Sequence, residues 1–333
     1  MSIGERIKQM RKAKGLSLRG LAQSVDVSAM AISKYERNQD IPSSGVLLRL
    51  SNVLNAPLDF FLRPTRLSVE LLAYRSHASL GVKEQGIIKG KIQNWIERYT
   101  ELESFFDGTM SISLPHYDVT SMEDVEEASQ LLRRDWKLGL DPIESMMELL
   151  EDRGIKVGLI TGSDEFDACI FMANNTPVIV VREDIPGDRQ RFNLCHELGH
   201  LVLKFKGDLG EEKASHRFAT AFLLPAESAR FELGHSRSNI DLKELELLKH
   251  KYGLSMQALI YRAKDLGIIS DSFAKNYFKR FRQKQWYRNE PGEPYKPEKP
   301  QRMERLIYRA LAEDIISRSK MLEYQSGFNS QPV

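Results

Sequence analysis

The sequence predicts a multidomain protein with an all-α N-terminal domain, an α+β domain that contains a small sheet, and a helical C-terminal extension. The chain of 333 residues exceeds the length of one typical domain, so two or more domains are expected. The first 66 residues contain only short helical patterns separated by turn signals. Strand patterns occur further along, and helical patterns surround them, at residues 155–160, 168–173 and 178–181.

These patterns divide the chain into four predicted parts. Residues 1–66 form the first domain, and residues 67–118 form a helical linker. Residues 119–270 form the α+β domain, and residues 271–333 form a basic and aromatic helical extension whose last helix runs from Met303 to Tyr324.

Composition and hydropathy indicate a soluble cytoplasmic protein with no membrane partner. The N-terminus lacks the apolar segment of a signal peptide, and no run of eighteen uninterrupted apolar residues occurs. The two cysteines, Cys169 and Cys195, fit a reducing compartment.

Charge is distributed unevenly, although the formal net charge is only +2. Residues 1–66 carry eleven Lys and Arg against five Asp and Glu, and residues 275–309 carry eleven against four. Such local excess suits a polyanionic partner. In the second region, aromatic residues alternate with basic ones. This mixture is either an auxiliary nucleic-acid surface or, as we favour, an ordered arm whose aromatic residues pack on the body.

The N-terminal domain contains two short helices joined by a tight turn. Ser17 is expected to cap a helix from Leu18 to Ser24, and Ser28 a helix from Ala29 to Asn38. Small polar and basic residues lie on the outer face of the second of these helices. This arrangement is the helix-turn-helix layout. The alternative interpretation is a helical protein-docking module that binds no nucleic acid.

The segment IKQMRKAKGLSLRGLAQSVDVSAMAISKYERNQDIPSSGVLLRLSNVLNAPLDFFL resembles the XRE (Cro/cI-like) family of DNA-binding domains. The resemblance implies that the third helix enters the major groove of a double-stranded DNA operator. Because Ala29 and Met30 are poor hydrogen-bonding residues, base readout is expected to be modest or to use apolar contacts with thymine methyl groups. The expected DNA-binding residues are Arg19, Ser28, Ala29, Met30, Ser33, Lys34 and Arg37.

One long helical run, from Lys83 to Phe106, fills much of the predicted linker. Its apolar residues recur at near-heptad spacing and form a stripe that needs a cover. The cover is either the body of the following domain or a second copy of the same helix. Since helix-turn-helix proteins commonly bind DNA as dimers, we expect a homodimer.

The pattern His196-Glu197-x-x-His200 lies in a predicted helix that begins near Asp188. Residues four apart on a helix lie about 40° apart around its axis, so both imidazoles can point at one position. Two neutral imidazoles suit Zn²⁺, and Glu197 beside them can take a proton from water. Gly199, which weakens a helix by about 1 kcal/mol relative to Ala, indicates that another backbone such as a strand passes close by. Alternatively, the two histidines are ordinary core residues, although the complete pattern favours a metal site.

A catalytic zinc site needs a third protein ligand, and the predicted helix that follows Gly210 offers candidates. Glu212 and His216 are again four residues apart, so one of them can complete the site while the other hydrogen-bonds a ligand. Glu211 lies about 100° further round the helix and is less favoured. An acidic first turn that is stabilised by the helix dipole explains one of the two glutamates without a metal.

The segments RFNLCHELGHLVL and EEKASHRFATAFLLP resemble the ImmA/IrrE metallopeptidases, and the similarity extends over roughly residues 120–270. The resemblance implies a zincin-like fold, with Zn²⁺ on His196, His200 and Glu212, and Glu197 as the catalytic general base. Mn²⁺ is the alternative ion expected in vitro. His216 is then a supporting residue or an alternative ligand. Ala214 departs from the family, which commonly has Glu or Gln there, so Glu212 is the better ligand candidate.

Together, the two resemblances imply a DNA-binding transcriptional regulator with zinc-dependent endopeptidase activity in a stress or phage response. The protein substrate expected from the family is an XRE-type repressor, and the chain's own linker near residues 67–82 is a second candidate. The strand before a zincin metal helix typically pairs with the substrate, so we expect an extended protein segment. The alternative is a non-catalytic, antitoxin-like regulator that uses the peptidase fold as a sensor or dimer scaffold, against which the intact Glu197 argues.

Overall fold

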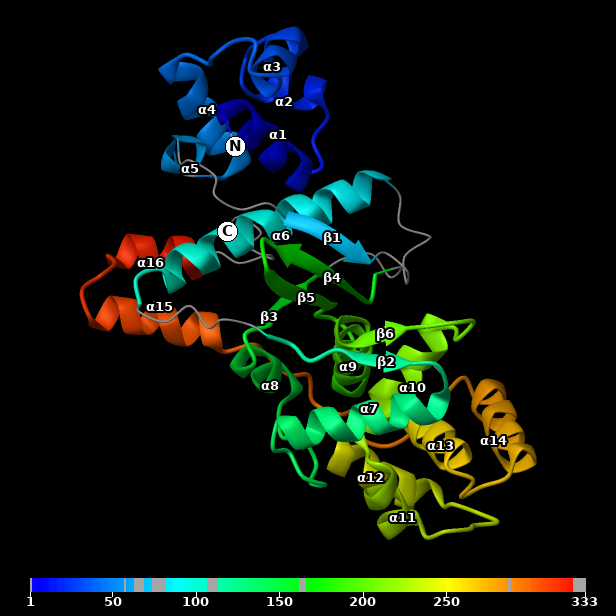
Figure 1. Cartoon of the computed structure of the whole chain (residues 1–333). Helices are drawn as coiled ribbons and strands as arrows, with labels where there is room; N and C mark the ends of the chain where they lie inside the picture. The colour runs from blue at the N-terminus through cyan, green and yellow to red at the C-terminus, as the bar shows by residue number, and fades with distance from the viewer. Residues whose placement is uncertain are drawn as a thin grey trace.

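The computed structural model describes residues 2–56, 58–62, 69–73, 82–106, 113–161, 166–286 and 289–325. From top to bottom in Figure 1, a helical N-terminal domain is followed by a long helix, a four-stranded sheet and a larger group of helices. Within these ranges, no helix is long and apolar enough to cross a membrane.

Five helices form the N-terminal domain: α1 (Ile3–Ala13), α2 (Leu18–Ser24), α3 (Ala29–Glu36), α4 (Ser44–Leu54) and α5 (Leu58–Leu62). A serine before each of the first four helices accepts a hydrogen bond from a backbone N–H of the first turn. The apolar faces meet in a core in which Ile7, Leu21 and Ile32 are fully buried. The predicted helical domain is confirmed. However, α3 ends at Glu36, because Asn38 adopts a left-handed conformation with φ of 56°.

Four strands form the main sheet in the order β1-β4-β5-β3. β3 (Lys156–Ile160) is parallel to β5 (Thr176–Arg182), and β4 (Ala168–Ala173) forms an antiparallel hairpin with β5. The hairpin turn includes Asn174, whose φ is 53°. These three strands lie within two residues of their predicted positions.

The fourth strand, β1 (Val69–Ala73), was not predicted. The sequence indicated a helical linker here, but these residues pair antiparallel with β4, with Val69 opposite Ala173 and Leu71 opposite Phe171. A strand of five residues gives too short an alternating pattern to be recognised alone. Its hydrogen-bonding partner comes from a distant part of the sequence, so only the tertiary structure defines it.

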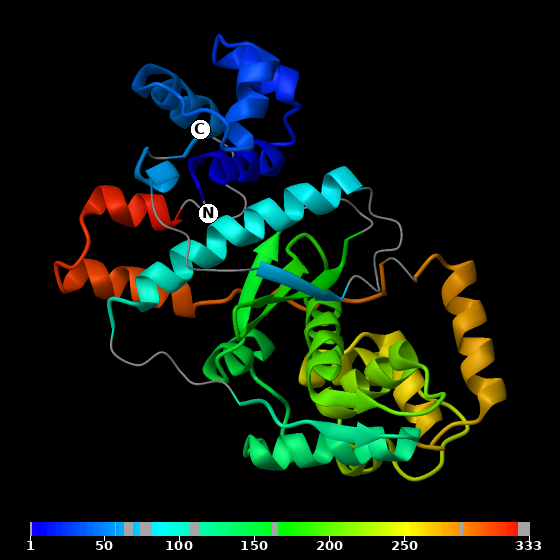
Figure 2. The same ribbon diagram turned by 45° about the horizontal axis from the view of Figure 1, so that its top comes forward.

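The long helix α6 (Val82–Glu103) lies across one face of the sheet, as Figures 1 and 2 show. Its residues Ile92, Ile96 and Tyr99 are buried against sheet residues such as Phe171 and Val178. The chain's own sheet is therefore the cover that the apolar stripe requires, and the stripe no longer supports a homodimer. On another side, α6 carries the N-terminal domain, and Arg6 of α1 forms an ion pair with Glu97 at 2.8 Å.

Helix α9 (Gly187–Val202) and its neighbours cover the opposite face of the sheet. The short strands β2 (Tyr117–Val119) and β6 (Leu203–Phe205) pair in parallel beside them. The other helices of this part are α7 (Met122–Asp135), α8 (Met146–Asp152), α10 (Glu211–Leu223), α11 (Ala226–Leu233), α12 (Leu242–Tyr252) and α13 (Met256–Asp265).

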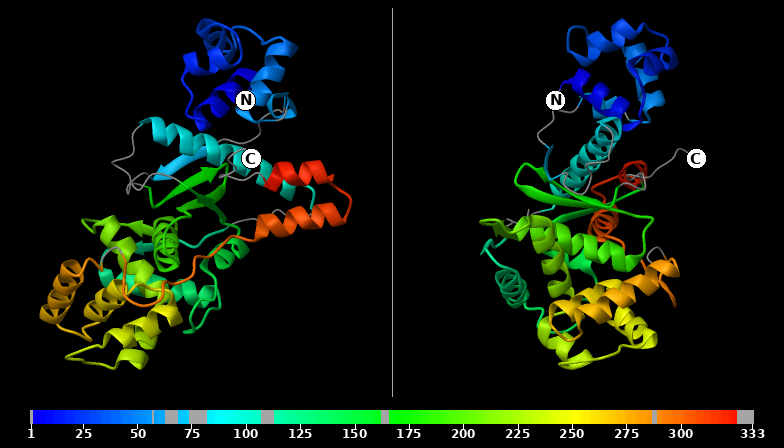
Figure 3. Two further views of the ribbon diagram at one scale, coloured as in Figure 1. Left: turned by 180° about the vertical axis from the view of Figure 1, so that it is seen from behind. Right: turned by 90° about the vertical axis from the view of Figure 1, so that its right-hand side faces the viewer.

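The C-terminal extension wraps the body and returns to α6 (Figure 3). It contains α14 (Asp271–Gln283), an extended arm that includes residues 289–301, α15 (Arg302–Ala312) and α16 (Arg318–Gln325). The prediction of one last helix was wrong, because the left-handed Asp314 (φ 54°) ends the first helical segment and turns the chain back. Tyr277 and Phe281 are buried, which supports the ordered-arm interpretation; Tyr287, one of the aromatic residues considered, lies outside the described residues.

Candidate metal centre

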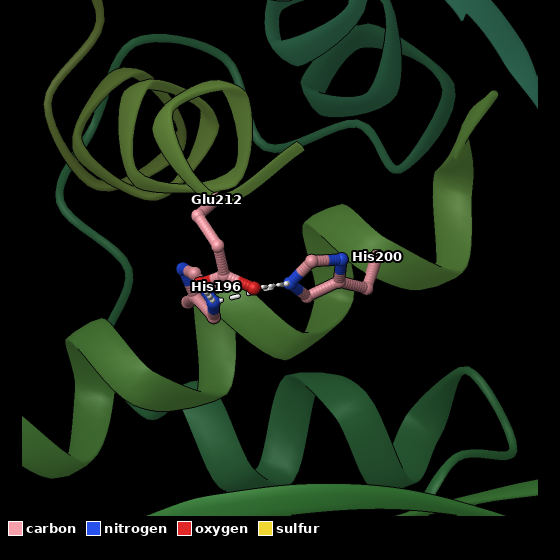
Figure 4. A group of neighbouring side chains, drawn as sticks. All are labelled: His196, His200 and Glu212. Carbon is pink, nitrogen blue, oxygen red and sulfur yellow. Dashed lines mark hydrogen bonds and ion pairs between the residues drawn. The ribbon is translucent and has the colours of Figure 1, made fainter. Parts of the chain in front are cut away.

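Helix α9 positions His196, Glu197 and His200. Its residues Leu194, Leu198 and Val202 are fully buried, and this apolar stripe fixes the rotation of the helix. The two histidines are then held on the side of α9 that meets α10 (Figure 4). The side chains of His196 and His200 are only 8% and 9% exposed, respectively.

The close approach that Gly199 permits is to a side chain of α10. A Cβ atom added at Gly199 would lie 3.2 Å from Cδ1 of Phe218. The sequence-based expectation of a passing strand was therefore wrong, since an aromatic ring of α10 fills this place. The contact draws the first turn of α10 toward the histidines, and that turn carries Glu212.

The side chains of His196, His200 and Glu212 converge on one point (Figure 4). Nε2 of His196 lies 3.1 Å from Nε2 of His200. The Glu212 carboxylate lies 3.4 Å from Nε2 of His196 and 3.6 Å from Nε2 of His200. A tetrahedral zinc ion with bonds of about 2.0–2.2 Å separates its ligand atoms by about 3.3–3.6 Å. The three separations lie within about 0.2 Å of this range, so the donor types and their spacing fit zinc held by three protein ligands.

The surroundings of the site set the protonation of two of its groups. Burial, with help from His200 and His216, lowers the pKa of His196 to about 3, so the imidazole is neutral at pH 7 as a metal ligand requires. Burial and the nearby Glu212 carboxylate raise the pKa of Glu197 to about 8. A carboxyl group with a pKa near neutrality suits a group that both accepts and returns a proton.

Ser215 takes the supporting position that the sequence suggested for His216. The Ser215 hydroxyl lies 3.4 Å from Nδ1 of His200, where it holds the ring orientation. The ring of His216 instead packs beside that of His196, with centroids 4.7 Å apart, and is not one of the three converging ligands. Sequence reasoning missed Ser215, although its place three residues after Glu212 puts both on one face of α10.

Comparison with known families assigns both parts of the chain. A profile described as "Helix-turn-helix" matches residues 7–61, and one described as "IrrE N-terminal-like domain" matches residues 151–264. The chain joins a helix-turn-helix domain to an IrrE N-terminal-like domain. The two resemblances seen in the sequence are thereby confirmed.

Similar curated proteins match the helix-turn-helix domain. The HTH-type transcriptional regulator ImmR of Bacillus subtilis is 34% identical over 62 residues, which are 19% of this chain and 49% of that protein. The SPbeta prophage-derived regulator YonR of the same organism is 34% identical over 68 residues, 20% of this chain and 63% of that protein. This chain thus spans about half to two thirds of their length. A crystal structure of Bacillus thuringiensis PlcR with the peptide PapR7 and DNA aligns over 99% of both chains at 14% identity, with a TM-score of only 0.18.

The strand that precedes α9, β5, is central in the sheet. β5 pairs with β4 on one side and with β3 on the other. The backbone N–H and C=O groups on both sides of β5 are therefore already paired. A substrate strand cannot pair with β5, so the expectation from the sequence was wrong. Any strand addition must use an edge of the sheet.

In the helix-turn-helix domain, the seven predicted DNA-binding residues lie on α2, on α3 or at the ends of α3. Met30 is 68% exposed, and the side chains of Arg19, Lys34 and Arg37 are also exposed. Ser28 caps α3 by accepting a hydrogen bond from the backbone N–H of Ala31. Ala29 is partly turned into the domain core, and Ser33 is half-buried.

Proposed function

We propose that the chain is a DNA-binding transcriptional regulator whose IrrE N-terminal-like domain is a zinc-dependent endopeptidase. The observation that carries the proposal is the spacing of the His196, His200 and Glu212 donor atoms, which fits tetrahedral zinc, beside the buried carboxyl group of Glu197. The proposed substrate is an extended segment of a protein, in the first place an XRE-type repressor.

The chemistry divides between the ion and the chain. Zinc held by His196, His200 and Glu212 would supply Lewis-acid polarisation of the scissile carbonyl and would lower the pKa of water to about 7. Glu197 accepts the proton of the attacking water and returns it to the leaving amine. Burial brings its pKa close to the working pH, so the carboxylate is a stronger base in the first step and the protonated form persists for the second.

The DNA partner is proposed from the exposed face of α3 and from the excess of basic residues in the first 66 positions. ImmR and YonR, which match this domain, are themselves described as transcriptional regulators. We further propose a homodimer on a two-fold operator, which mass measurement by light scattering with and without DNA tests. Because the proposed partner is a DNA operator, we propose a cytoplasmic location.

Mass spectrometry of candidate repressors incubated with the zinc-loaded chain tests the peptidase proposal. Glu197→Gln is expected to retain zinc and DNA binding and to lower the cleavage rate by about 10²–10⁴, the usual contribution of a general base. Wild-type protein that leaves every repressor intact, with a transcriptional response unchanged in Glu197→Gln, would instead support the non-catalytic scaffold.

The same spectra test cleavage in cis at residues 67–82, of which the structure describes 69–73 and 82. Chain that stays at full length while a repressor is cut excludes self-cleavage.

A further inference from the structure

The strand β1 comes from outside the matched peptidase domain. β3, β4 and β5 all lie within residues 151–264, which the IrrE N-terminal-like profile covers. β1 belongs to the segment between the helix-turn-helix domain and α6, and it pairs with β4 along Val69–Ala73. Figures 1 and 2 show it at the rim of the sheet, beside α6. Without β1, the outer row of N–H and C=O groups of β4 would form an open sheet edge.

This edge is the one that flanks the candidate metal centre. At about 100° per residue, Arg189, His196 and His200 lie within about 40° of one another around α9. Arg189 forms an ion pair with Asp167, directly before β4, at 2.5 Å. That side of α9 therefore faces the β4 side of the sheet.

The opposite side of α9 faces the other edge. Arg191 donates a hydrogen bond to the backbone carbonyl of Ile143 at 2.7 Å, and Sγ of Cys195 lies 3.5 Å from Sδ of Met146 in α8. Helix α8 in turn packs against β3. The edge formed by β3 thus lies away from the histidines, which leaves the β4 edge for a substrate.

We propose that β1 is an internal competitor that occupies the substrate position of the peptidase, and that an extended protein substrate must displace it to be cleaved. This inference rests on the proposed function. An extended peptide binds a sheet edge through main-chain hydrogen bonds, and β1 already makes this antiparallel pairing with β4. Since β1 directly connects the DNA-binding domain to α6, its release also changes the tether between the two domains.

A disulfide staple tests the proposal in the full-length, zinc-loaded chain. Glu70 lies opposite Met172 in the register, and Met172 is only partly buried, so Glu70→Cys/Met172→Cys is suited to cross-link β1 to β4. Both native cysteines are buried and do not compete. Leu71→Pro is the complementary variant, because proline disrupts strand pairing, and Leu71→Val is its matched control.

The binding measurement uses a fluorescein-labelled peptide of residues 68–74, Ser-Val-Glu-Leu-Leu-Ala-Tyr, in a Glu197→Gln background so that it is not cut. Anisotropy is expected to show binding to Leu71→Pro and to the reduced staple, and none to the oxidised staple. If β1 is released in about one chain in ten, Leu71→Pro binds about tenfold more tightly than Leu71→Val. A scrambled peptide of the same composition controls for non-specific binding. Equal binding to the oxidised and reduced staple, or no binding to Leu71→Pro with unchanged zinc content, overturns the proposal.

The cleavage measurement uses unfolded, fluorescein-labelled casein with Glu197 intact. Oxidation of the staple is expected to abolish cleavage, and dithiothreitol is expected to restore it. Cleavage that continues at full rate in the oxidised staple overturns the proposal that β1 competes with the substrate, but it leaves the peptidase proposal intact. If no variant cleaves casein but the peptide binds as expected, the peptidase proposal fails. The proposal that β1 occupies a peptide-binding edge of β4 is then still supported.

Discussion

At the scale of single residues, burial sets the protonation state of two side chains at the candidate centre, His196 and Glu197. His196 is 6% exposed and Glu197 is 5% exposed, and burial shifts both away from their charged forms. Glu212, whose side chain is 45% exposed, lies at the solvent side of the site. The three converging side chains are two imidazoles that are little exposed and one carboxylate at the solvent side. This set carries one negative charge against the two positive charges of zinc.

We expect Glu212→Gln to weaken zinc binding much more than Glu211→Gln. Only Glu212 belongs to the converging group, and a lost ligand costs more than the ~10–100-fold caused by loss of an outer hydrogen-bonding partner. Titration against a chromophoric chelator measures both affinities. The assignment of the third ligand is wrong if the Glu211 variant loses zinc while the Glu212 variant retains it.

At the scale of elements, the distance between α9 and α10 determines whether the ligands meet. Gly199 lets the Phe218 ring approach, and Phe218 stacks on Phe222 with ring centroids 5.6 Å apart. About 100° further round α10, Arg217 reaches Glu126 of α7 at 3.0 Å. Helix α10 is thus held between an apolar contact toward α9 and an ionic contact toward α7.

Gly199→Ala is expected to lower zinc affinity although alanine favours a helix by about 1 kcal/mol over glycine. The added Cβ, 3.2 Å from the Phe218 ring, moves α10 and its Glu212 outward. Phe218→Leu in the same chain is expected to recover part of the zinc affinity. Gly86→Ala in α6, where the nearest atom is 3.9 Å away, is the control with unchanged zinc binding. Full zinc affinity in Gly199→Ala would show that the helix spacing tolerates the extra carbon.

Glu126→Gln is expected to destabilise the domain by about 3–5 kcal/mol, because Arg262, which is 0% exposed, loses its charged partner. Burial alone would raise the pKa of Glu126, but Arg262 and Arg217 hold this pKa below its usual 4.5. The resulting stability is present above pH 4.5 and is lost as the pH falls through the lowered folded-state value. The free energy of unfolding in urea, measured from about pH 3 to about pH 7, should therefore vary less with pH in the variant. Exposed Glu127→Gln should behave like wild type.

At the scale of the whole molecule, α6 connects the two domains. It contacts α1 of the DNA-binding domain through the Arg6–Glu97 ion pair, and it covers the sheet of the peptidase domain. Its end is held by the C-terminal extension, where Leu102 packs with Ile307 and Tyr324. In Figure 1, α3 lies at the end of the molecule remote from the peptidase helices, so its outer face is open to DNA.

Lys34→Ala and Arg37→Ala are each expected to weaken DNA binding similarly across sequences and to reduce the slope of log affinity against log salt by about 1. Both side chains are exposed on or beside α3. Anisotropy titrations at several salt concentrations measure the slope. Lys279→Ala in α14, from the second basic region, is the control and should leave the slope unchanged. A lower slope in that variant would show that the C-terminal extension also contacts DNA.

The features that depend on short spacings could be predicted from the order of the residues. Serine caps and apolar periodicity located the helices of the first domain, and the interval of four between His196 and His200 placed two imidazoles on one helix face. The same spacing of four residues made both Glu212 and His216 candidates for the third ligand, and the sequence pattern alone cannot decide between them. Local geometry is readable in this way because neighbouring residues in a helix have fixed relative positions.

Contacts between distant segments became known from the folded chain. It brought Glu212 together with His196 and His200 and placed Ser215 beside His200, because the packing of Phe218 on Gly199 sets the rotation of α10. It also placed β1 on the edge of β4 and α6 over the sheet. A strand pairs with whichever segment supplies hydrogen-bonding partners for its backbone groups, and a helix packs where its apolar face is buried. These partners can lie at any distance along the sequence, so no fixed spacing reveals them.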